Sequence, residues 1–340
     1  MYCSFNLLLE EKMKRSVLAL IFTLLLTSCY AYSAPVEEPM QSKLHKELTS
    51  SLKHKSIPKW VPVEPLSDVP LQAKAAILIN FETGEILFEK NVDESLPIAS
   101  MSKIMTELLV LEAIEAGELD WDDSVIISEY AYTISNQPGY ASVQLERDKK
   151  YTIEDLFYAM AIQSANGATI ALAEATSGSE KDFVTLMNDK AAELQLKDTH
   201  FVNSTGLTNE DLLNFHSIGS PEDSNKMSAS NLATLVKHII HHYPDLLNIT
   251  KQISFDFQGK THYNSNWMLP GTENDWVETD IIFPGIDGLK TGYTNDAGYG
   301  FAGTVEINGF RFISVIIGTE TIEDRFVETK ILYESIAEQM

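Results

Sequence analysis

Residues 100–103 of this 340-residue chain, Ser-Met-Ser-Lys, have the types and spacing of a serine nucleophile with a lysine base. Apolar residues recur at helical intervals after Ser100, so Ser100 and Lys103 should share one face at a helix start. The Lys103 amine could then take the proton of the Ser100 hydroxyl, provided that the amine is neutral. Burial, the positive end of the helix and a second cation would each lower the pKa of Lys103 toward the ~7–8 that suits a general base.

Two further groups could complete such a site. Ser164-Ala165-Asn166 lies in a tight link between two expected helices, and Lys290-Thr291-Gly292 lies on an expected strand. Lys290 could be the second cation that lowers the pKa of Lys103. Each group alone is a weak signal, because short patterns recur by chance and serine is a favoured helix cap. Their order along the chain, each on a suitable element, makes the combination specific.

Backbone groups beside these residues could stabilise the charge that develops in such a reaction. The N–H groups of Ser100 and Tyr293 could hold an oxyanion, and losing one such donor typically costs ~2.7–4 kcal/mol of barrier. Gly292 would let the backbone of a substrate approach the strand, as glycines in strands often do.

The elements that must position these residues follow from periodicity. The pattern predicts a β-hairpin from residues 75–79 and 85–89. Helices are predicted over 100–116, 152–163 (capped by Thr152), 168–176 and 182–194. Later strands are predicted over 285–292, 298–305 and 310–317, with a type I′ turn at Asn308-Gly309 and a last helix from about 322. This order predicts a mixed α+β domain, an antiparallel sheet built from both chain ends and flanked by helices.

Four stretches resemble the signatures of the penicillin-interacting serine enzymes, and more closely those of low-molecular-mass penicillin-binding proteins that are D-alanyl-D-alanine carboxypeptidases. They are residues 97–106, 164–167, 203–207 and 285–294. The likeness covers roughly residues 70–335 and implies a fold of the penicillin-binding protein and β-lactamase type.

The resemblance implies removal of the terminal D-alanine from peptidoglycan stem pentapeptides, inhibition by β-lactams, and no metal or organic cofactor. The roles carried over are acyl-enzyme formation by Ser100, proton transfer by Lys103, proton shuttling and peptide binding by Ser164 and Asn166, and binding of the terminal carboxylate by Lys290 with Thr291.

Residues 1–34 are expected to form an export signal. Lys14 and Arg15 precede an apolar run over 17–26 that is too short to span a bilayer comfortably. Acidic residues among the first 12 do not suit the basic start of such a signal, which favours translation from Met13. We therefore expect an extracytoplasmic protein, secreted or tethered to the outer face of a bacterial cell membrane.

Cys29 closes a Leu-Thr-Ser-Cys stretch that resembles the bacterial lipobox, in which the cysteine is lipidated. Ordinary cleavage shortly after Cys29 is the alternative. Residues 35–70 are polar and proline-rich and predict a flexible tether, followed by a serine peptidase domain over 71–340. Many members of the resembled family add a β-rich domain and a C-terminal membrane helix. We expect no C-terminal β-rich domain here, which favours an N-terminal anchor.

Two alternatives remain open. Residues 210–214 match the ExxLN pattern with which class A β-lactamases activate their deacylating water, although a glutamate in a polar loop is usually solvated. A non-catalytic sensor could instead bind a β-lactam or a stem peptide. Retention of Ser100, Lys103 and Lys290 argues against a degenerate sensor.

Other signals are weaker. His238, His241, His242 and Asp245 could suggest a metal site, but histidines in a last helical turn before Pro244 more often meet the helix dipole and solvent, so no metal is expected. The formal net charge of −24 would repel phosphate backbones, which argues against nucleic-acid binding.

Overall fold

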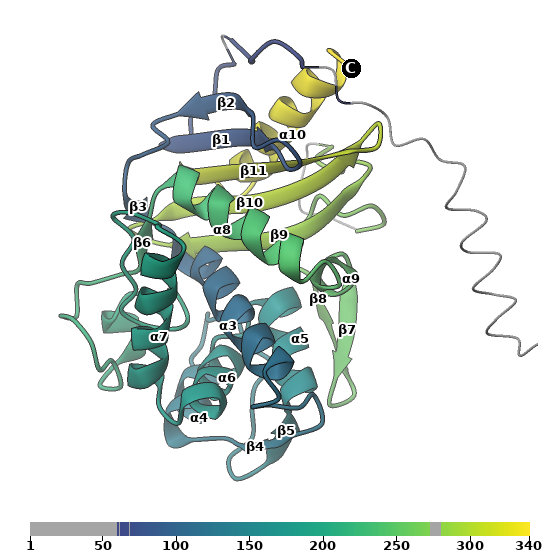
Figure 1. The fold of residues 1–340 in the computed structure, drawn as a ribbon. Helices are drawn as coiled ribbons and strands as arrows, with labels where there is room; N and C mark the ends of the chain where they lie inside the picture. The colour runs from purple at the N-terminus through teal and green to yellow at the C-terminus, as the bar shows by residue number, and fades with distance from the viewer. Residues whose placement is uncertain (1–59, 61, 68, 273–279) are drawn as a thin grey trace, which may run out of the picture. The chain divides into compact units, whose positions relative to one another are not determined.

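The computed structural model describes residues 60, 62–67, 69–272 and 280–340 (Figure 1). The predicted export signal, Cys29 and most of the predicted tether lie outside these residues. The last described part of the tether contacts the domain: the Trp60 ring packs edge-on against Phe310, with ring centroids 5.1 Å apart. The Trp60 indole N–H also donates a hydrogen bond of 2.9 Å to Glu85. Contact with the sheet therefore begins before the predicted domain start at residue 71.

A five-stranded antiparallel sheet is built from both ends of the described chain, as the sequence predicted. Its strand order is β2-β1-β11-β10-β9 (Figure 1). The strands are β1 (Ala75–Asn80), β2 (Ile86–Lys90), β9 (Ile286–Thr294), β10 (Gly298–Ile307) and β11 (Phe310–Thr319). The β10–β11 turn has positive φ at both central residues, 51° at Asn308 and 83° at Gly309, as a type I′ turn requires.

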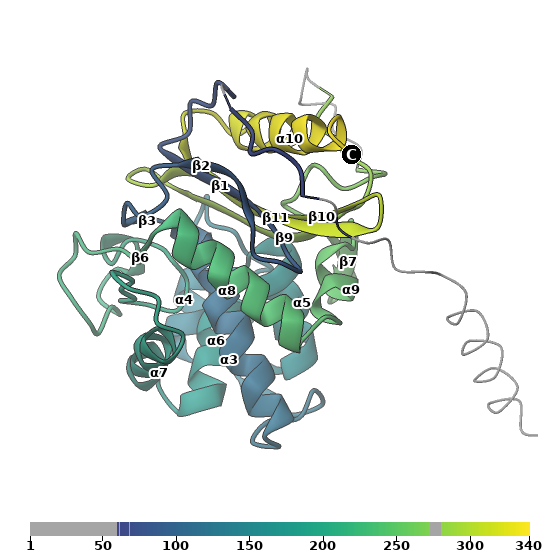
Figure 2. The same ribbon diagram turned by 45° about the horizontal axis from the view of Figure 1, so that its top comes forward.

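Both faces of this sheet are covered. Along β1, Ile77 and Ile79 belong to the core shared with the central helices, whereas Ala76 and Leu78 belong to the core under α10 (Asp324–Ala337). Successive side chains of a strand point to opposite faces. Figure 2 shows α10 above the sheet and α8 (Ala229–His242) beneath it. A strand buried on both faces is mostly apolar, which explains the apolar run over residues 75–79 of β1.

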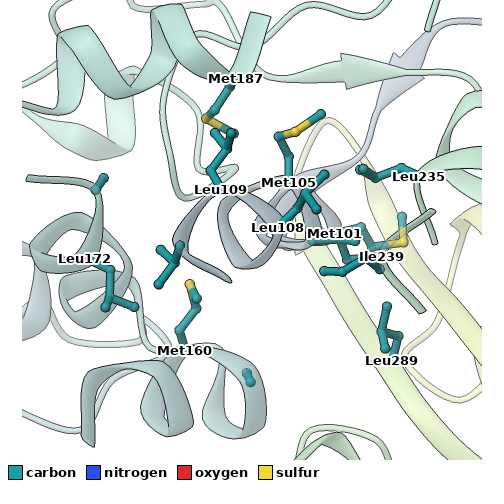
Figure 3. Close-up of a cluster of buried hydrophobic side chains, with 14 of the residues drawn as sticks. Met101, Met105, Leu108, Leu109, Met160, Leu172, Met187, Leu235, Ile239 and Leu289 are labelled. Atoms are coloured by element: carbon teal, nitrogen blue, oxygen red, sulfur yellow. The ribbon is translucent and has the colours of Figure 1, made fainter. Parts of the chain in front are cut away.

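The helix α3 (Lys103–Glu115) lies at the centre of the helical layer, and residues 103–110 are all buried. The helices α5 (Ile153–Gln163), α6 (Asn166–Ser177), α7 (Glu180–Glu193) and α8 surround it. Figure 3 shows part of the core where these helices meet the turn before α3 and the strand β9, with Met101, Met105, Leu108, Leu109, Met160, Leu172, Met187, Leu235, Ile239 and Leu289 labelled. Close packing on every side fixes the helix that carries Lys103.

The predicted helices exist, with shifted ends. The first begins as a 3-10 turn, Ala99–Ser102, before α3, and the predicted 168–176 helix starts earlier, at Asn166. Thr152 caps α5 as predicted, accepting a hydrogen bond of 3.0 Å from the backbone N–H of Asp155. The predicted last helix begins at Asp324.

Several short elements were not predicted, because their patterns extend over too few residues. They are α4 (Glu129–Ser135), α9 (Leu246–Thr250), the 3-10 turn Glu210–Leu212, and the strand pairs β3 (Leu96–Pro97) with β6 (Lys226–Met227), β4 (Ser124–Ile126) with β5 (Lys150–Thr152), and β7 (Ser254–Phe257) with β8 (Lys260–Tyr263). Within the described part of the chain, no helix combines the length and apolarity needed to cross a bilayer.

Candidate active site

Ser100 lies in the 3-10 turn that leads into α3, which agrees with its predicted place at a helix start. The preceding residue, Ala99, has a left-handed φ of 47°, a conformation that L-residues adopt only when the surroundings impose it. The Ser102 hydroxyl donates a hydrogen bond of 2.7 Å to the Ala99 carbonyl and holds this bend. Ser100 is half-buried and faces a cleft of about 410 Å³.

The Lys103 amine is fully buried and lies at hydrogen-bond distance from three oxygens. It is 2.9 Å from Ser100 Oγ, 2.8 Å from Asn166 Oδ1 and 2.6 Å from the Thr205 carbonyl. A neutral amine has two N–H groups and one lone pair. The amide and carbonyl oxygens can only accept, so they take the two N–H groups and leave the lone pair to face the Ser100 hydroxyl.

The protonation state agrees with this arrangement. Burial, and then the positive charge of Lys290, hold the pKa of Lys103 well below its ordinary value, while Glu107 opposes the shift. The neutral amine that a general base requires is therefore favoured at this position.

Asn166 reaches the same amine from the junction of two helices, where Ser164 also lies. Ser164 ends α5 in a left-handed conformation with φ of 63°, and the chain turns sharply there into α6, whose first residue is Asn166. The Asn166 backbone N–H donates a bond of 3.0 Å to the Ala141 carbonyl, which ties this junction to the neighbouring loop. Both side chains line the cleft beside Ser100.

The strand β9 brings the third predicted group to the opposite wall. Thr291 lines the cleft, and its hydroxyl donates a bond of 2.7 Å to Ser265. Lys290 is only 1% exposed and does not line the cleft. Its positive charge therefore acts on the cleft from within the protein. Burial lowers the pKa of Lys290 to about 8, and Glu107 opposes that shift. Tyr293 is exposed and stacks on Tyr299, with ring centroids 4.1 Å apart.

Gly292 has close neighbours within the protein. A Cβ there would lie 2.8 Å from the Ile98 carbonyl and 3.2 Å from the backbone nitrogen of Met101. The glycine therefore lets β9 approach the turn that carries Ser100.

The loop over residues 203–207 was part of the family resemblance, but no role was predicted for it. Its Thr205 carbonyl accepts from Lys103. The loop is held by buried hydrogen bonds: Asn203 Oδ1 accepts from the Thr205 and Gly206 N–H groups, and Glu180 accepts from the backbone and hydroxyl of Ser204. This network fixes a carbonyl that orients the base.

Arg325 is a residue of the cleft that the sequence did not indicate. It projects from α10, is 4% exposed, lines the cleft, and donates a bond of 3.2 Å to the Gly292 carbonyl. Burial lowers its pKa to about 9. No motif surrounds Arg325, and only the packing of α10 over the sheet brings it beside β9.

The other candidate groups lie elsewhere. Glu210 of the ExxLN match is exposed and does not line the cleft, although its neighbour Asp211 does. The rings of His238 and His242 contact each other near the end of α8, with centroids 4.2 Å apart and planes tilted by 36°. Among the described residues, no group of three or more potential metal-ligating side chains is placed to hold an ion.

A serine nucleophile at a helix start, a buried lysine base and a Lys-Thr-Gly strand on an antiparallel sheet define the penicillin-interacting class of serine proteins. Residues 63–321 match the sequence model of the family described as D-alanyl-D-alanine carboxypeptidase, and the chain belongs to this family.

Individual relatives agree with this assignment to the family. The chain is 35% identical over 267 residues to D-alanyl-D-alanine carboxypeptidase DacF of Bacillus subtilis, an alignment covering 78% of this chain and 62% of the relative. It thus spans less than two thirds of that relative.

Solved structures extend the likeness to the fold. One is described as a peptidoglycan synthesis regulatory factor (PBP3) from Streptococcus pneumoniae, with TM-score 0.74, 38% identity, and coverage of 79% of this chain and 74% of that one. Another is penicillin-binding protein D2 of Listeria monocytogenes in its cefotaxime-bound form, with TM-score 0.67, 32% identity, and coverage of 79% of this chain and 98% of that one.

Proposed function

We propose that this protein is a serine-type D-alanyl-D-alanine carboxypeptidase that removes the terminal D-alanine from peptidoglycan stem pentapeptides. The observation that carries the proposal is the position of the Lys103 amine, 2.9 Å from Ser100 Oγ and within hydrogen-bond distance of two acceptors, Asn166 Oδ1 and the Thr205 carbonyl. Such a pair activates a serine without a histidine.

In the proposed first step, Ser100 Oγ attacks the carbonyl carbon of the penultimate D-alanine while Lys103 takes the hydroxyl proton. The amide bond to the terminal D-alanine breaks, an ester to Ser100 remains, and the proton passes to the leaving amine. Ser164 lies at the same cleft and is suited to relay that proton. The N–H groups of Ser100 and Tyr293, both residues of the cleft, would hold the oxyanion.

The terminal carboxylate of the substrate needs a positive partner. The Thr291 hydroxyl would turn from Ser265 to donate to it from the wall of the cleft. Lys290 would attract it from within the protein, and Arg325 adds a second cation at the same wall. In the second step a water molecule attacks the ester, releases the shortened peptide and returns the proton to Ser100.

The same serine should react with β-lactams, whose strained amide resembles the scissile bond. Relatives solved with cefotaxime and ampicillin support this proposal. Incubating the purified protein with penicillin should add one drug mass to Ser100, located by peptide mass spectrometry, and a stem pentapeptide should release D-alanine. The Ser100→Ala variant is the control and should do neither. Label on any other residue would overturn the mechanism.

The alternatives have their own outcomes in these assays. Rapid turnover of nitrocefin would favour a β-lactamase, which the exposed position of Glu210 does not support. Stable labelling of Ser100 without any release of D-alanine would favour a sensor of β-lactams or stem peptides.

We also propose that the protein acts outside the cytoplasm, where the stem peptides are, and is held at the membrane by lipid on Cys29. The apolar run before Cys29 supports this proposal. Radiolabelled palmitate should be incorporated into the full chain and not into the Cys29→Ser variant. Equal incorporation in both would exclude Cys29 as the lipidated residue.

A further inference from the structure

Glu107 is a buried carboxylate one helical turn after Lys103. Residues four apart on a helix lie on the same face, so Glu107 and Lys103 are neighbours along α3. Glu107 is 0% exposed, and neither of its carboxylate oxygens has a hydrogen-bond partner among the described residues. The proposed reaction steps do not use this residue.

A buried carboxylate without hydrogen bonds is unfavourable unless nearby positive charge compensates for the lost hydration. Lys290 provides that charge, because it interacts with Glu107 through space and the second buried amine nearby, Lys103, is neutral in the working site. All three side chains are at most 1% exposed, so little solvent screens the charges among them. Burial raises the pKa of Glu107 to about 7, against the opposing effects of Lys290 and Lys103.

Other charged groups around α3 have lesser parts. Arg325 of α10 faces Lys290 and lowers its pKa. The remaining charged side chains in partly or fully buried positions on the helices packed against α3 are Asp155 of α5, Glu174 of α6, Glu180 and Lys190 of α7, and Lys237 and His238 of α8. The shifts of the three buried groups arise from burial, from one another and from Arg325.

We propose that Glu107 is a positioning residue of the proposed carboxypeptidase reaction, which keeps Lys290 positively charged while Lys103 is neutral. With Glu107 ionised, this working state of the three side chains has no net charge. With a neutral side chain at position 107, the same state would bury an uncompensated positive charge. Lys290 would then release its proton at a lower pH, and the positive partner of the substrate carboxylate would be lost.

The test is the pH profile of penicillin acylation in the Glu107→Gln variant, which keeps the shape of the side chain and removes its charge. The basic limb should move to lower pH by about one unit, the effect expected of a close opposite charge. Below about pH 6 the wild-type carboxyl is itself protonated, given its pKa of about 7, so the two profiles should converge there.

Glu112→Gln is the matched control, because Glu112 lies on the same helix but forms a half-buried ion pair with Lys190, 3.0 Å away. Its profile should coincide with that of the wild type. Coincident basic limbs in the Glu107→Gln variant and the wild type, with both proteins acylated at Ser100, would overturn the role of Glu107 and leave the proposed function intact. Absence of acylation in the wild type would instead refute the proposed function.

A second measurement needs neither activity nor a folded variant. In wild-type protein labelled with ¹³C at glutamate carboxyl and lysine Cε positions, the carboxyl resonance assigned to Glu107 through its bonded neighbours should titrate near pH 7. Lysine Cε resonances should shift with the same midpoint, because the groups are coupled. If the Glu107 carboxyl titrated near its ordinary value, or no lysine resonance followed it, the proposal would be wrong.

Discussion

At the scale of single residues, the neutral amine of Lys103 depends on its surroundings more than on its spacing from Ser100. Three oxygens contact the amine, and burial with Lys290 holds its pKa down. The same lysine on an exposed helix would be protonated at neutral pH and could not accept a proton. The chemistry of the pair is therefore a property of the site.

Replacing Lys103 by methionine tests its part as the base. The unbranched side chain fills the same space, so the fold should persist, but acylation by penicillin should fall on the order of 10³-fold because general-base catalysis is lost. Stopped-flow or mass-spectrometric acylation rates measure the effect, and near-ultraviolet circular dichroism reports the fold. Lys181→Met, at an exposed position of α7, is the control and should retain the wild-type rate. A normal rate in Lys103→Met would remove Lys103 from the mechanism.

The same substitution should change how stability depends on pH. Burial holds the pKa of Lys103 below its ordinary value of 10.5, so between the two values the unfolded chain binds more protons than the folded one. Wild-type stability should therefore rise with pH across this window and decline as pH falls. The free energy of unfolding of Lys103→Met minus that of the wild type should be larger at about pH 7 than at about pH 10 in urea titrations. A difference that grows with pH would contradict the direction of the shift.

At the scale of elements, the site depends on close approach between backbones. The turn Ala99–Ser102 packs between β9 and the 203–207 loop. Gly292 permits the close approach of β9 to this turn, and Gly206, with a positive φ of 83°, permits that of the 203–207 loop. A Cβ on Gly206 would lie 2.0 Å from the Ala99 carbonyl oxygen, next to the nucleophile.

Gly206→Ala should therefore both destabilise the protein and slow acylation. Gly178→Ala is the matched control, since Gly178 has nearly the same φ of 81° but nothing within 4 Å of an added Cβ. The control should lose only ~1 kcal/mol of unfolding free energy, the cost of holding an alanine in the left-handed conformation. Gly206→Ala should cost a further ~1–3 kcal/mol for the forced displacement of the turn. Urea unfolding and acylation rates check both, and equal losses in the two variants would show that the turn yields without strain.

At the scale of the whole molecule, the two ends of the described domain meet in one sheet, and α10 closes its outer face (Figure 2). One buried contact across this face joins the Tyr333 hydroxyl of α10 to the Ser314 hydroxyl of β11, with the oxygens 2.7 Å apart. Both side chains are completely buried. The same helix places Arg325 in the cleft. The packing of α10 on the sheet therefore contributes both to the stability of the fold and to the structure of the site.

A double-mutant cycle measures that contact. Tyr333→Phe should cost ~1–3 kcal/mol, because Ser314 is left buried without its partner. Adding Ser314→Ala should recover part of this loss, since the stranded hydroxyl is removed. Tyr263→Phe, at a side chain that is 68% exposed, should leave the free energy of unfolding almost unchanged. Strict additivity of the two core substitutions in urea unfolding would show that the hydroxyls do not interact.

Much of the fold and part of the site could be predicted from local sequence. The sheet strands follow from apolar runs and the Asn308-Gly309 turn, and α5 from its Thr152 cap, because these signals act over a few residues. The short elements, such as α4 and the β7–β8 hairpin, could not be predicted with the same certainty, since tertiary contacts rather than periodicity stabilise them.

The sequence by itself determined which residues can react: Ser100 with Lys103 at helical spacing, and the ordered groups around Asn166 and Lys290. Only the tertiary structure decided the protonation of Lys103, the use of the Thr205 carbonyl, and the presence of Glu107 and Arg325 beside the pair. The physical reason is the separation along the chain over which each effect acts. Helical spacing is a local property of the chain, whereas burial and through-space charge depend on what packing brings together from distant segments.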